Sequence, residues 1–200
     1  MAEIKAQAVK ELRQKTGLGM MDCKQALQES DGDIEKAVEF LRKKGLSAVE
    51  KRAGRDASEG LIETYIHHGS RLGVMVEVNC ETDFVARTED FQEFAKDVAM
   101  HIAAAQPLAV DRQSISTELV EKEKAIYLEQ SKNEGKPEHI AEKIVEGRLD
   151  KFYQDNCLME QAFVKNPDQT IDELLIELTA KIGEKISVRR FTRFVLGEDG

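Results

Sequence analysis

The sequence predicts an α+β fold, in which a three-helix N-terminal domain precedes a small three-stranded antiparallel sheet covered by helices. Within the first 45 residues, apolar side chains recur at helical spacing in three short runs. Over residues 72–80 the apolar period changes to two, which is typical of a half-buried strand. Helical spacing then returns before a last strand-like run, so we expect a small sheet with helices on one face.

The first domain, residues 1–46, is expected to hold three short helices around a shared core, because helices of this length are marginal alone. Thr16-Gly17 ends the first helix, and the turn at 30–33 ends the second. Asp33 is placed to cap the third helix, and Gly45 is placed to end it. The predicted core positions are Ile4, Ala8, Val9 and Leu12, then Cys23, Ala26 and Leu27, and finally Ile34, Ala37, Val38 and Leu41.

Residues 47–59 lose this pattern and become basic, so we expect a linker there, followed by one α+β domain over residues 60–200. A hairpin turn at 68–71 is predicted to join the first two strands. The three strands are expected at 61–67, 72–80 and 186–196.

Four helices are expected between the second and third strands. The first ends before Pro107, the second covers 117–133 with a weak pattern, and Pro137 opens the third. A capping box at 170–173 begins the fourth helix, which Gly183 ends. The predicted inward residues are Phe91, Phe94, Ala95, Val98 and Ile102 in the first, Ile140, Ala141, Ile144, Val145, Leu149 and Phe152 in the third, and Leu174, Leu175 and Leu178 in the fourth.

The net charge of −9 is spread unevenly over the chain. Residues 1–55 have 12 Lys and Arg against 9 Asp and Glu, whereas residues 56–200 have 17 against 29. Nucleic-acid binding needs a basic stripe that neutralises phosphates, so this acidic body favours a protein partner instead. There is neither an apolar run long enough to span a membrane nor an apolar leader, so we expect a cytoplasmic protein without membrane contact.

No arrangement of residues indicates a catalytic site, a cofactor or a metal site. The chain has no phosphate-binding glycine loop, no GxSxG and no HExxH, and its four histidines are interpreted as surface or packing residues. The scattered Cys23, Cys80 and Cys157 indicate reduced thiols, with an intermolecular disulfide through Cys80 or Cys157 left open. We therefore expect a protein that is not an enzyme.

Two segments are not explained by folding alone. The loop at 17–21 holds three large apolar side chains, which either fill the small helical core or form an adaptable docking surface. Asp83 and Phe84 follow the second strand, where the structural alternative makes Phe84 a hydrophobic staple and Thr82 or Asp83 a helix cap.

The same two segments carry a family resemblance. The N-terminal signature of elongation factor Ts is similar to Leu12-Arg13-x-x-Thr16-Gly17-x-Gly19-Met20-Met21-Asp22-Cys23-Lys24-x-Ala26-Leu27. The second signature of that family is similar to Asn79-Cys80-Glu81-Thr82-Asp83-Phe84-Val85-Ala86. The similarity extends from residue 1 to about 197, in order and without large gaps. It implies a guanine nucleotide exchange factor for the translation GTPase elongation factor Tu.

The resemblance also implies a role for each segment. In the family, a three-helix domain of the ubiquitin-associated type docks on the GTP-binding domain of elongation factor Tu, and the matching residues are Leu12, Arg13, Met20, Met21 and Lys24. The second segment inserts beside the partner's nucleotide and dislodges its Mg²⁺ so that GDP leaves and GTP binds. The residues that match this segment are Thr82, Asp83, Phe84 and Val85.

The chain is similar to the short form of the family, which lacks a second strand-and-helix subdomain and a C-terminal helical arm. The resemblance implies a homodimer that forms through the two sheets. An exposed apolar sheet face suits such an interface, and the residues expected to share it are Met75, Phe191 and Val195. A cover formed by residues 156–166 is the alternative use of this face.

Two rival functions remain from the sequence. An adaptor whose three-helix head binds a ubiquitin-like or unrelated protein would explain the loop at 17–21, but it gives residues 82–85 no task. A thiol enzyme would use Cys80 or Cys157, but no histidine or basic residue is placed to activate either thiol. Addition of the chain to GDP-loaded elongation factor Tu would separate these functions from exchange.

Overall fold

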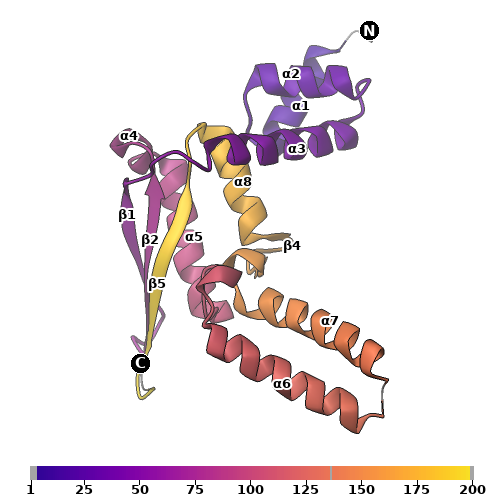
Figure 1. Cartoon of the computed structure of the whole chain (residues 1–200). Helices are drawn as coiled ribbons and strands as arrows, with labels where there is room; N and C mark the ends of the chain where they lie inside the picture. The colour runs from indigo at the N-terminus through magenta and orange to yellow at the C-terminus, as the bar shows by residue number, and fades with distance from the viewer. Residues whose placement is uncertain (1–3, 136, 199–200) are drawn as a thin grey trace. The chain divides into compact units, whose positions relative to one another are not determined.

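The computed structural model describes residues 4–135 and 137–198 and confirms the predicted α+β class. The chain begins with α1 (Ala6–Thr16), α2 (Met20–Glu29), α3 (Ile34–Arg52), β1 (Glu59–Ile66) and β2 (Leu72–Cys80) (Figure 1). It continues with α4 (Asp83–Ala86), α5 (Glu89–Ala105), α6 (Thr117–Asn133), α7 (Glu138–Asn156), β3 (Ala162–Phe163), β4 (Asn166–Thr170), α8 (Ile171–Ile182) and β5 (Ser187–Val195). Short 3-10 helices lie at Arg112–Ser114 and Leu158–Glu160.

Contacts within the chain define two compact units, and both units contain segments that are distant in sequence. The first unit comprises the residues up to Leu61 together with 78–94 and 173–187. The second comprises 62–77, 95–172 and the residues from Val188 on. The division into residues 1–46, 47–59 and 60–200 stays a prediction from the sequence.

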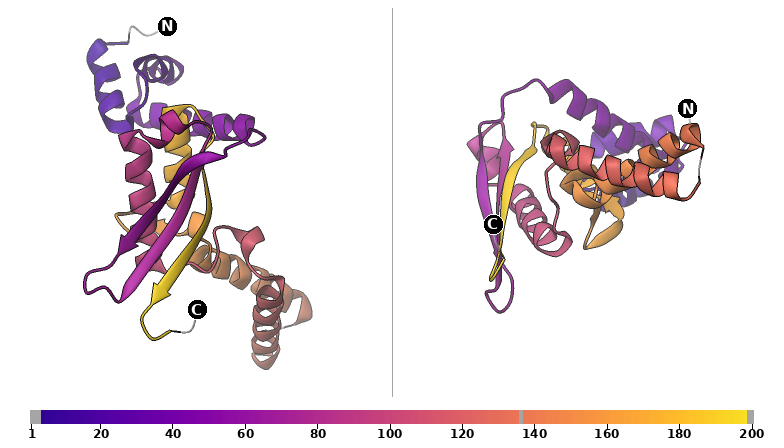
Figure 2. Two further views of the ribbon diagram at one scale, coloured as in Figure 1. Left: turned by 90° about the vertical axis from the view of Figure 1, so that its left-hand side faces the viewer. Right: turned by 60° about the horizontal axis from the view of Figure 1, so that its bottom comes forward.

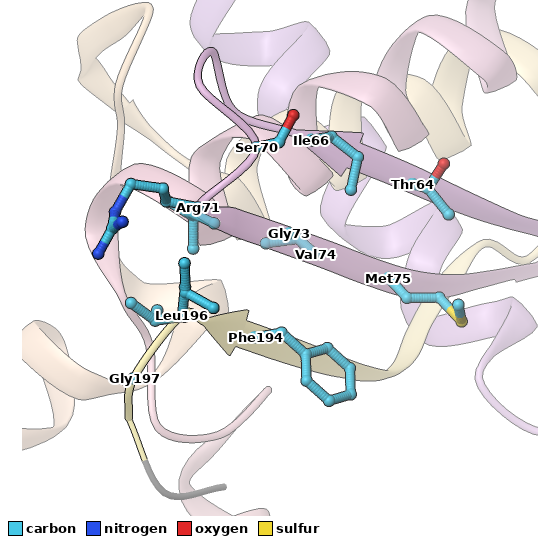
Figure 3. A pocket seen from close by; sticks show the side chains of 12 residues that line it. Thr64, Ile66, Ser70, Arg71, Gly73, Val74, Met75, Phe194, Leu196 and Gly197 are labelled. Atoms are coloured by element: carbon cyan, nitrogen blue, oxygen red, sulfur yellow. The ribbon is translucent and has the colours of Figure 1, made fainter.

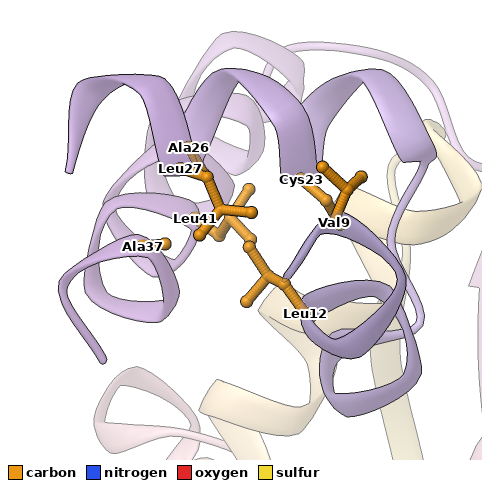
Figure 4. Close-up of a cluster of buried hydrophobic side chains, with 7 residues drawn as sticks. All are labelled: Val9, Leu12, Cys23, Ala26, Leu27, Ala37 and Leu41. Atoms are coloured by element: carbon orange, nitrogen blue, oxygen red, sulfur yellow. The ribbon is translucent and has the colours of Figure 1, made fainter. Parts of the chain in front are cut away.

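The first three helices pack around one small core, as predicted. Gly17, with a φ of 67°, ends α1, and the Asp33 carboxylate accepts the backbone N–H groups of Glu35 and Lys36 at 3.0 and 3.1 Å. Both predicted helix ends are therefore confirmed. The buried residues of this core are Val9, Leu12, Cys23, Ala26, Leu27, Ala37 and Leu41 (Figure 4).

The third helix is longer than the sequence predicts. It continues through Gly45 to Arg52, so the prediction that Gly45 ends it is wrong, and residues 47–52 of the expected linker are helical. A Cβ at position 45 would lie 3.1 Å from Ile176 Cγ2 and 3.6 Å from Ala180 Cβ, both in α8. Glycine at position 45 therefore permits close packing of two helices and does not terminate α3.

The strands β1, β2 and β5 form an antiparallel sheet in that order, and all three predicted strands are confirmed within two residues. The hairpin turn uses Gly69 and Ser70, with φ of 89° and 55°, and a hydrogen bond from His67 N–H to Leu72 O at 2.9 Å closes it. Figure 2 shows α5 along one face of this sheet. The buried side chains of β2 are Val74, Val76, Val78, Asn79 and Cys80.

The helix α5 buries its predicted apolar stripe, whereas the α6–α7 hairpin is less buried than expected. In α7 only Ala141 and Val145 are fully buried, and Ile140 is 40% exposed, so the inward assignment of Ile140 is wrong. Two paired helices share a narrow seam, which leaves a neighbouring position on the rim. The antiparallel pair β3–β4 was not predicted, because a strand of two residues has no readable period.

His101 has the packing role that the sequence indicates. Its ring is fully buried, with Nε2 3.0 Å from Gln161 Oε1, while Nδ1 accepts the backbone N–H of Val164 at 3.3 Å. Gln161 in turn donates from Nε2 to Asp155 O at 2.7 Å. Burial lowers the pKa of His101, so the neutral ring joins α5 to the segment that carries β3.

Candidate functional site

The segment after β2 presents a phenylalanine to solvent. Thr82 precedes the single-turn helix α4, and its Oγ1 accepts the N–H of Val85 at 3.4 Å, so Thr82 caps this helix. Asp83 pairs with Arg87 at 2.8 Å on the surface. Phe84 is 77% exposed, the largest exposed fraction of any large hydrophobic residue among those described. A hydrophobic staple would be buried, so that interpretation of Phe84 is wrong.

Hydrogen bonds to the loop between α8 and β5 hold the base of this segment. Glu184 accepts the Thr82 N–H with Oε2 at 3.0 Å and the Thr82 hydroxyl with Oε1 at 2.8 Å. Glu81 Oε1 accepts the Lys185 N–H at 2.6 Å, and Arg55 Nη1 donates to both Glu81 oxygens at 3.1 and 3.2 Å. The Lys185 backbone bond and then Arg55 hold the pKa of Glu81 below its usual value, against a smaller opposing effect of burial.

The loop between α1 and α2 divides its apolar side chains between the core and solvent. Leu18 is half-buried and packs against the three-helix core, as one of the two alternatives predicts. Met20 and Met21, the first residues of α2, are 57% and 76% exposed, as the docking alternative predicts. The two methionines therefore form an apolar surface at the start of α2.

The other three residues matched to the docking signature differ in exposure. Arg13 on α1 and Lys24 on α2 are both exposed, whereas Leu12 is fully buried in the three-helix core. Leu12 can therefore influence a partner only by fixing the position of α1, and the direct contacts available at this surface are apolar from Met20 and Met21 and cationic from the two basic residues.

The face of the sheet that carries Met75 contains an apolar groove of about 470 Å³ (Figure 3). Met75, Phe194 and Leu196 line it and are 49%, 67% and 63% exposed. Hydrogen bonding of Leu196 N–H to Arg71 O at 2.8 Å fixes the end of β5 beside the start of β2. An exposed apolar surface is thus built from two neighbouring strands.

The strand β5 directs different aromatic residues to this groove than the sequence suggests. Phe191 and Val195 are half-buried, while the exposed positions alternate with them at Thr192, Phe194 and Leu196. Among the described residues, none from 156–166 lines the groove, so the cover that the alternative would require is not seen there.

Comparison with known proteins places these features in a family. The family model described as elongation factor TS matches residues 5–198. This chain belongs to the elongation factor Ts family. Elongation factor Ts of Desulforamulus reducens is 60% identical over 198 residues, which cover 99% of this chain and 91% of that protein. Elongation factor Ts of Caldanaerobacter subterraneus subsp. tengcongensis is 58% identical over 195 residues, which cover 98% of each chain.

Members of the elongation factor Ts family are the nucleotide exchange factors for elongation factor Tu, so the function predicted from the two signatures is confirmed. They act in translation elongation and are not enzymes. The relatives are of nearly the same length as this chain, so its similarity to the short form of elongation factor Ts is also confirmed.

The described part of this elongation factor Ts chain offers neither a metal site nor an activated thiol. Within residues 4–135 and 137–198, no three His, Cys, Asp or Glu residues are grouped to hold a metal ion. Cys23, Cys80 and Cys157 are free and buried, and burial raises the pKa of Cys80 and of Cys157 to about 11. Thiolate is therefore scarce at neutral pH, which argues against the thiol-enzyme rival. In the same two ranges, no helix is long and apolar enough to cross a membrane.

Proposed function

We propose that the chain accelerates nucleotide exchange through two surfaces with different tasks. Met20, Met21, Arg13 and Lys24 dock on the GTP-binding domain of elongation factor Tu, with Leu12 holding α1 in place from the core. Residues 82–85 then dislodge the Mg²⁺ ion beside the bound nucleotide. The 77% exposure of Phe84 carries this proposal, because it leaves a large apolar side chain free to enter the partner.

Displacement of the metal would release GDP because Mg²⁺ is one of the main attachments of a nucleotide to such a GTPase. The ion bridges the phosphates to a Ser or Thr of the phosphate-binding loop and to a conserved Asp. An aromatic side chain inserted between packed helices favours an arrangement in which these ligands are misplaced. By linkage, an exchange factor that prefers the nucleotide-free GTPase weakens nucleotide binding by the same factor.

The energies require both surfaces. A 10⁴-fold faster release corresponds to about 5.5 kcal/mol of differential stabilisation. Burial of one phenylalanine contributes roughly 1.5–3 kcal/mol. Phe84 alone therefore falls short, and the docking of α1 and α2 supplies the remaining stabilisation that keeps residues 82–85 in the partner.

Release of a fluorescent GDP analogue from elongation factor Tu tests this function directly. We expect the chain to accelerate release in a saturable manner, and added Mg²⁺ to reduce the acceleration, because the metal and the exchange factor favour opposite states. Binding without any acceleration would contradict the proposal and would support an adaptor. An acceleration that is insensitive to Mg²⁺ would contradict the metal-displacement step alone.

We further propose that two copies of the chain associate through the groove on the sheet, in the cytoplasm where translation elongation takes place. Met75 and Phe194 would lie at the centre of this interface, with Phe191 and Val195 behind them in β5. The support is the run of exposed apolar side chains along the sheet, which also includes Ile62 and Ile66 at 60% and 63% exposure. Such a face is costly to leave in water and suits a self-complementary contact.

Sedimentation equilibrium at micromolar concentration is expected to give the mass of two chains. The double variant Met75→Glu/Phe194→Glu is expected to give the mass of one, because two buried carboxylates would face each other across a symmetric interface. Val164→Glu serves as the control, since Val164 is 42% exposed and does not line the groove. A single-chain mass for the unmodified protein would rule out the dimer.

A further inference from the structure

The orientation of Phe84 depends on the backbone that carries it. Because the side chain is 77% exposed, packing within the chain does little to hold it. The helix α4 has only four residues, and a single turn of helix is not stable by itself. Contacts outside α4 must therefore fix the direction in which Phe84 points.

The strongest of these contacts is the carboxylate of Glu184. It accepts two hydrogen bonds from one residue, the Thr82 N–H at 3.0 Å and the Thr82 hydroxyl at 2.8 Å. Bonds to an ionised acceptor are stronger than neutral ones, and two of them restrict both the backbone and the side-chain torsion of Thr82. With its proton directed to Glu184, the Thr82 oxygen presents its lone pairs to the N–H of Val85, the bond that caps α4.

A second carboxylate completes a reciprocal arrangement. Glu81 accepts the N–H of Lys185 at 2.6 Å, while its neighbour Thr82 donates to Glu184, the residue before Lys185. Two adjacent residues after β2 are thus joined to two adjacent residues before β5 by crossed bonds. Lys185 Nζ also donates to Ala53 O at 2.8 Å, which ties in the chain that leaves α3.

We propose that Glu184 is a positioning residue for nucleotide exchange, which acts on the partner through Thr82 by holding Phe84 in the orientation needed for insertion. The inference rests on the proposed role of residues 82–85. It differs from a purely structural role, because loss of Glu184 leaves the apolar core intact and releases only the single turn that bears Phe84. The consequence is a slower exchange step in a complex that still forms.

The test measures release of labelled GDP at increasing concentrations of each exchange-factor variant, which separates the maximal rate from the half-saturating concentration. Glu184→Ala is expected to lower the maximal rate about five- to tenfold, with the half-saturating concentration changed less than about twofold. Glu184→Gln is expected to recover most of the rate, since its amide oxygen accepts the Thr82 N–H and its NH₂ group donates to Thr82 Oγ1. Glu160→Ala is the matched control, because Glu160 accepts two bonds from Arg112 at 2.6 and 2.7 Å but has no contact with Thr82.

A double-mutant cycle decides whether Glu184 acts through Phe84. In the Phe84→Ala background, Glu184→Ala is expected to slow release less than about twofold further, because no aromatic side chain remains to be oriented. Equal, multiplicative losses in both backgrounds would overturn the positioning role while leaving that of Phe84 intact. A normal rate for Phe84→Ala alone would instead overturn the role of residues 82–85. If Glu184→Ala unfolds at the assay temperature, Glu184→Met, which keeps the side-chain length without acceptors, replaces it in the same cycle.

Discussion

Phe84→Ala is expected to lower the maximal rate of GDP release by about 10- to 100-fold, which corresponds to the roughly 1.5–3 kcal/mol of apolar burial that the substitution removes. Because Phe84 contributes to the inserted state and not to docking, the affinity for elongation factor Tu should change little. Stopped-flow release of a fluorescent GDP analogue at saturating exchange factor measures the rate, and titration calorimetry measures the affinity.

The folded state of the variant should be unaffected, since Phe84 is mostly in solvent. Leu108→Ala is a suitable control, because Leu108 is another exposed apolar residue, at 57%, and lies outside residues 82–85. An unchanged release rate for Phe84→Ala would refute the assignment. A parallel loss of affinity and rate would place Phe84 in the docking surface.

Met20→Ser/Met21→Ser is expected to weaken the complex with elongation factor Tu on the order of 30-fold, or about 2 kcal/mol, because two apolar contacts are replaced by hydroxyl groups. At saturating concentrations the double variant should still reach a maximal exchange rate close to that of the unmodified chain. The two parameters would thus change in the opposite way to those of Phe84→Ala.

Titration calorimetry gives the dissociation constant for this comparison. The midpoint of thermal unfolding should stay the same, because both methionines are exposed. Leu46→Ser provides the control within the same three helices, since Leu46 on α3 is 43% exposed and lies outside the loop. Equal affinity of the double variant and the unmodified chain would remove the docking role.

Local rules predicted the parts of the fold that local interactions decide. Gly17 and Asp33 act within one helical turn, and the turn at Gly69 and Ser70 acts within four residues, so each was identifiable from its neighbours in sequence. Gly45 was not, because glycine serves both to end a helix and to admit a second one. Only the approach of Ile176, which is distant in sequence, separates these two uses.

The candidate site was predictable to the same extent. The sequence identified residues 82–85 as unusual, but periodicity alone favoured a buried Phe84, and the exposed ring follows from how the rest of the core is filled. The facing of β5 depends on its register with β2, so Phe194 and not Phe191 lines the groove. Glu184 carried no indication at all, since its partner Thr82 is 102 residues away.

The extension of α3 to Arg52 has a consequence for how the two surfaces cooperate in time. Only residues 53–58 separate the end of α3 from the start of β1, and six residues span at most about 20 Å when extended. After α1 and α2 have bound, residues 82–85 are presented to the same partner molecule at an effective concentration that a short tether raises to the millimolar range or about that order. Insertion is then an intramolecular event whose rate is independent of how much exchange factor is free, so a lengthened tether should slow exchange without any change to a contacting residue.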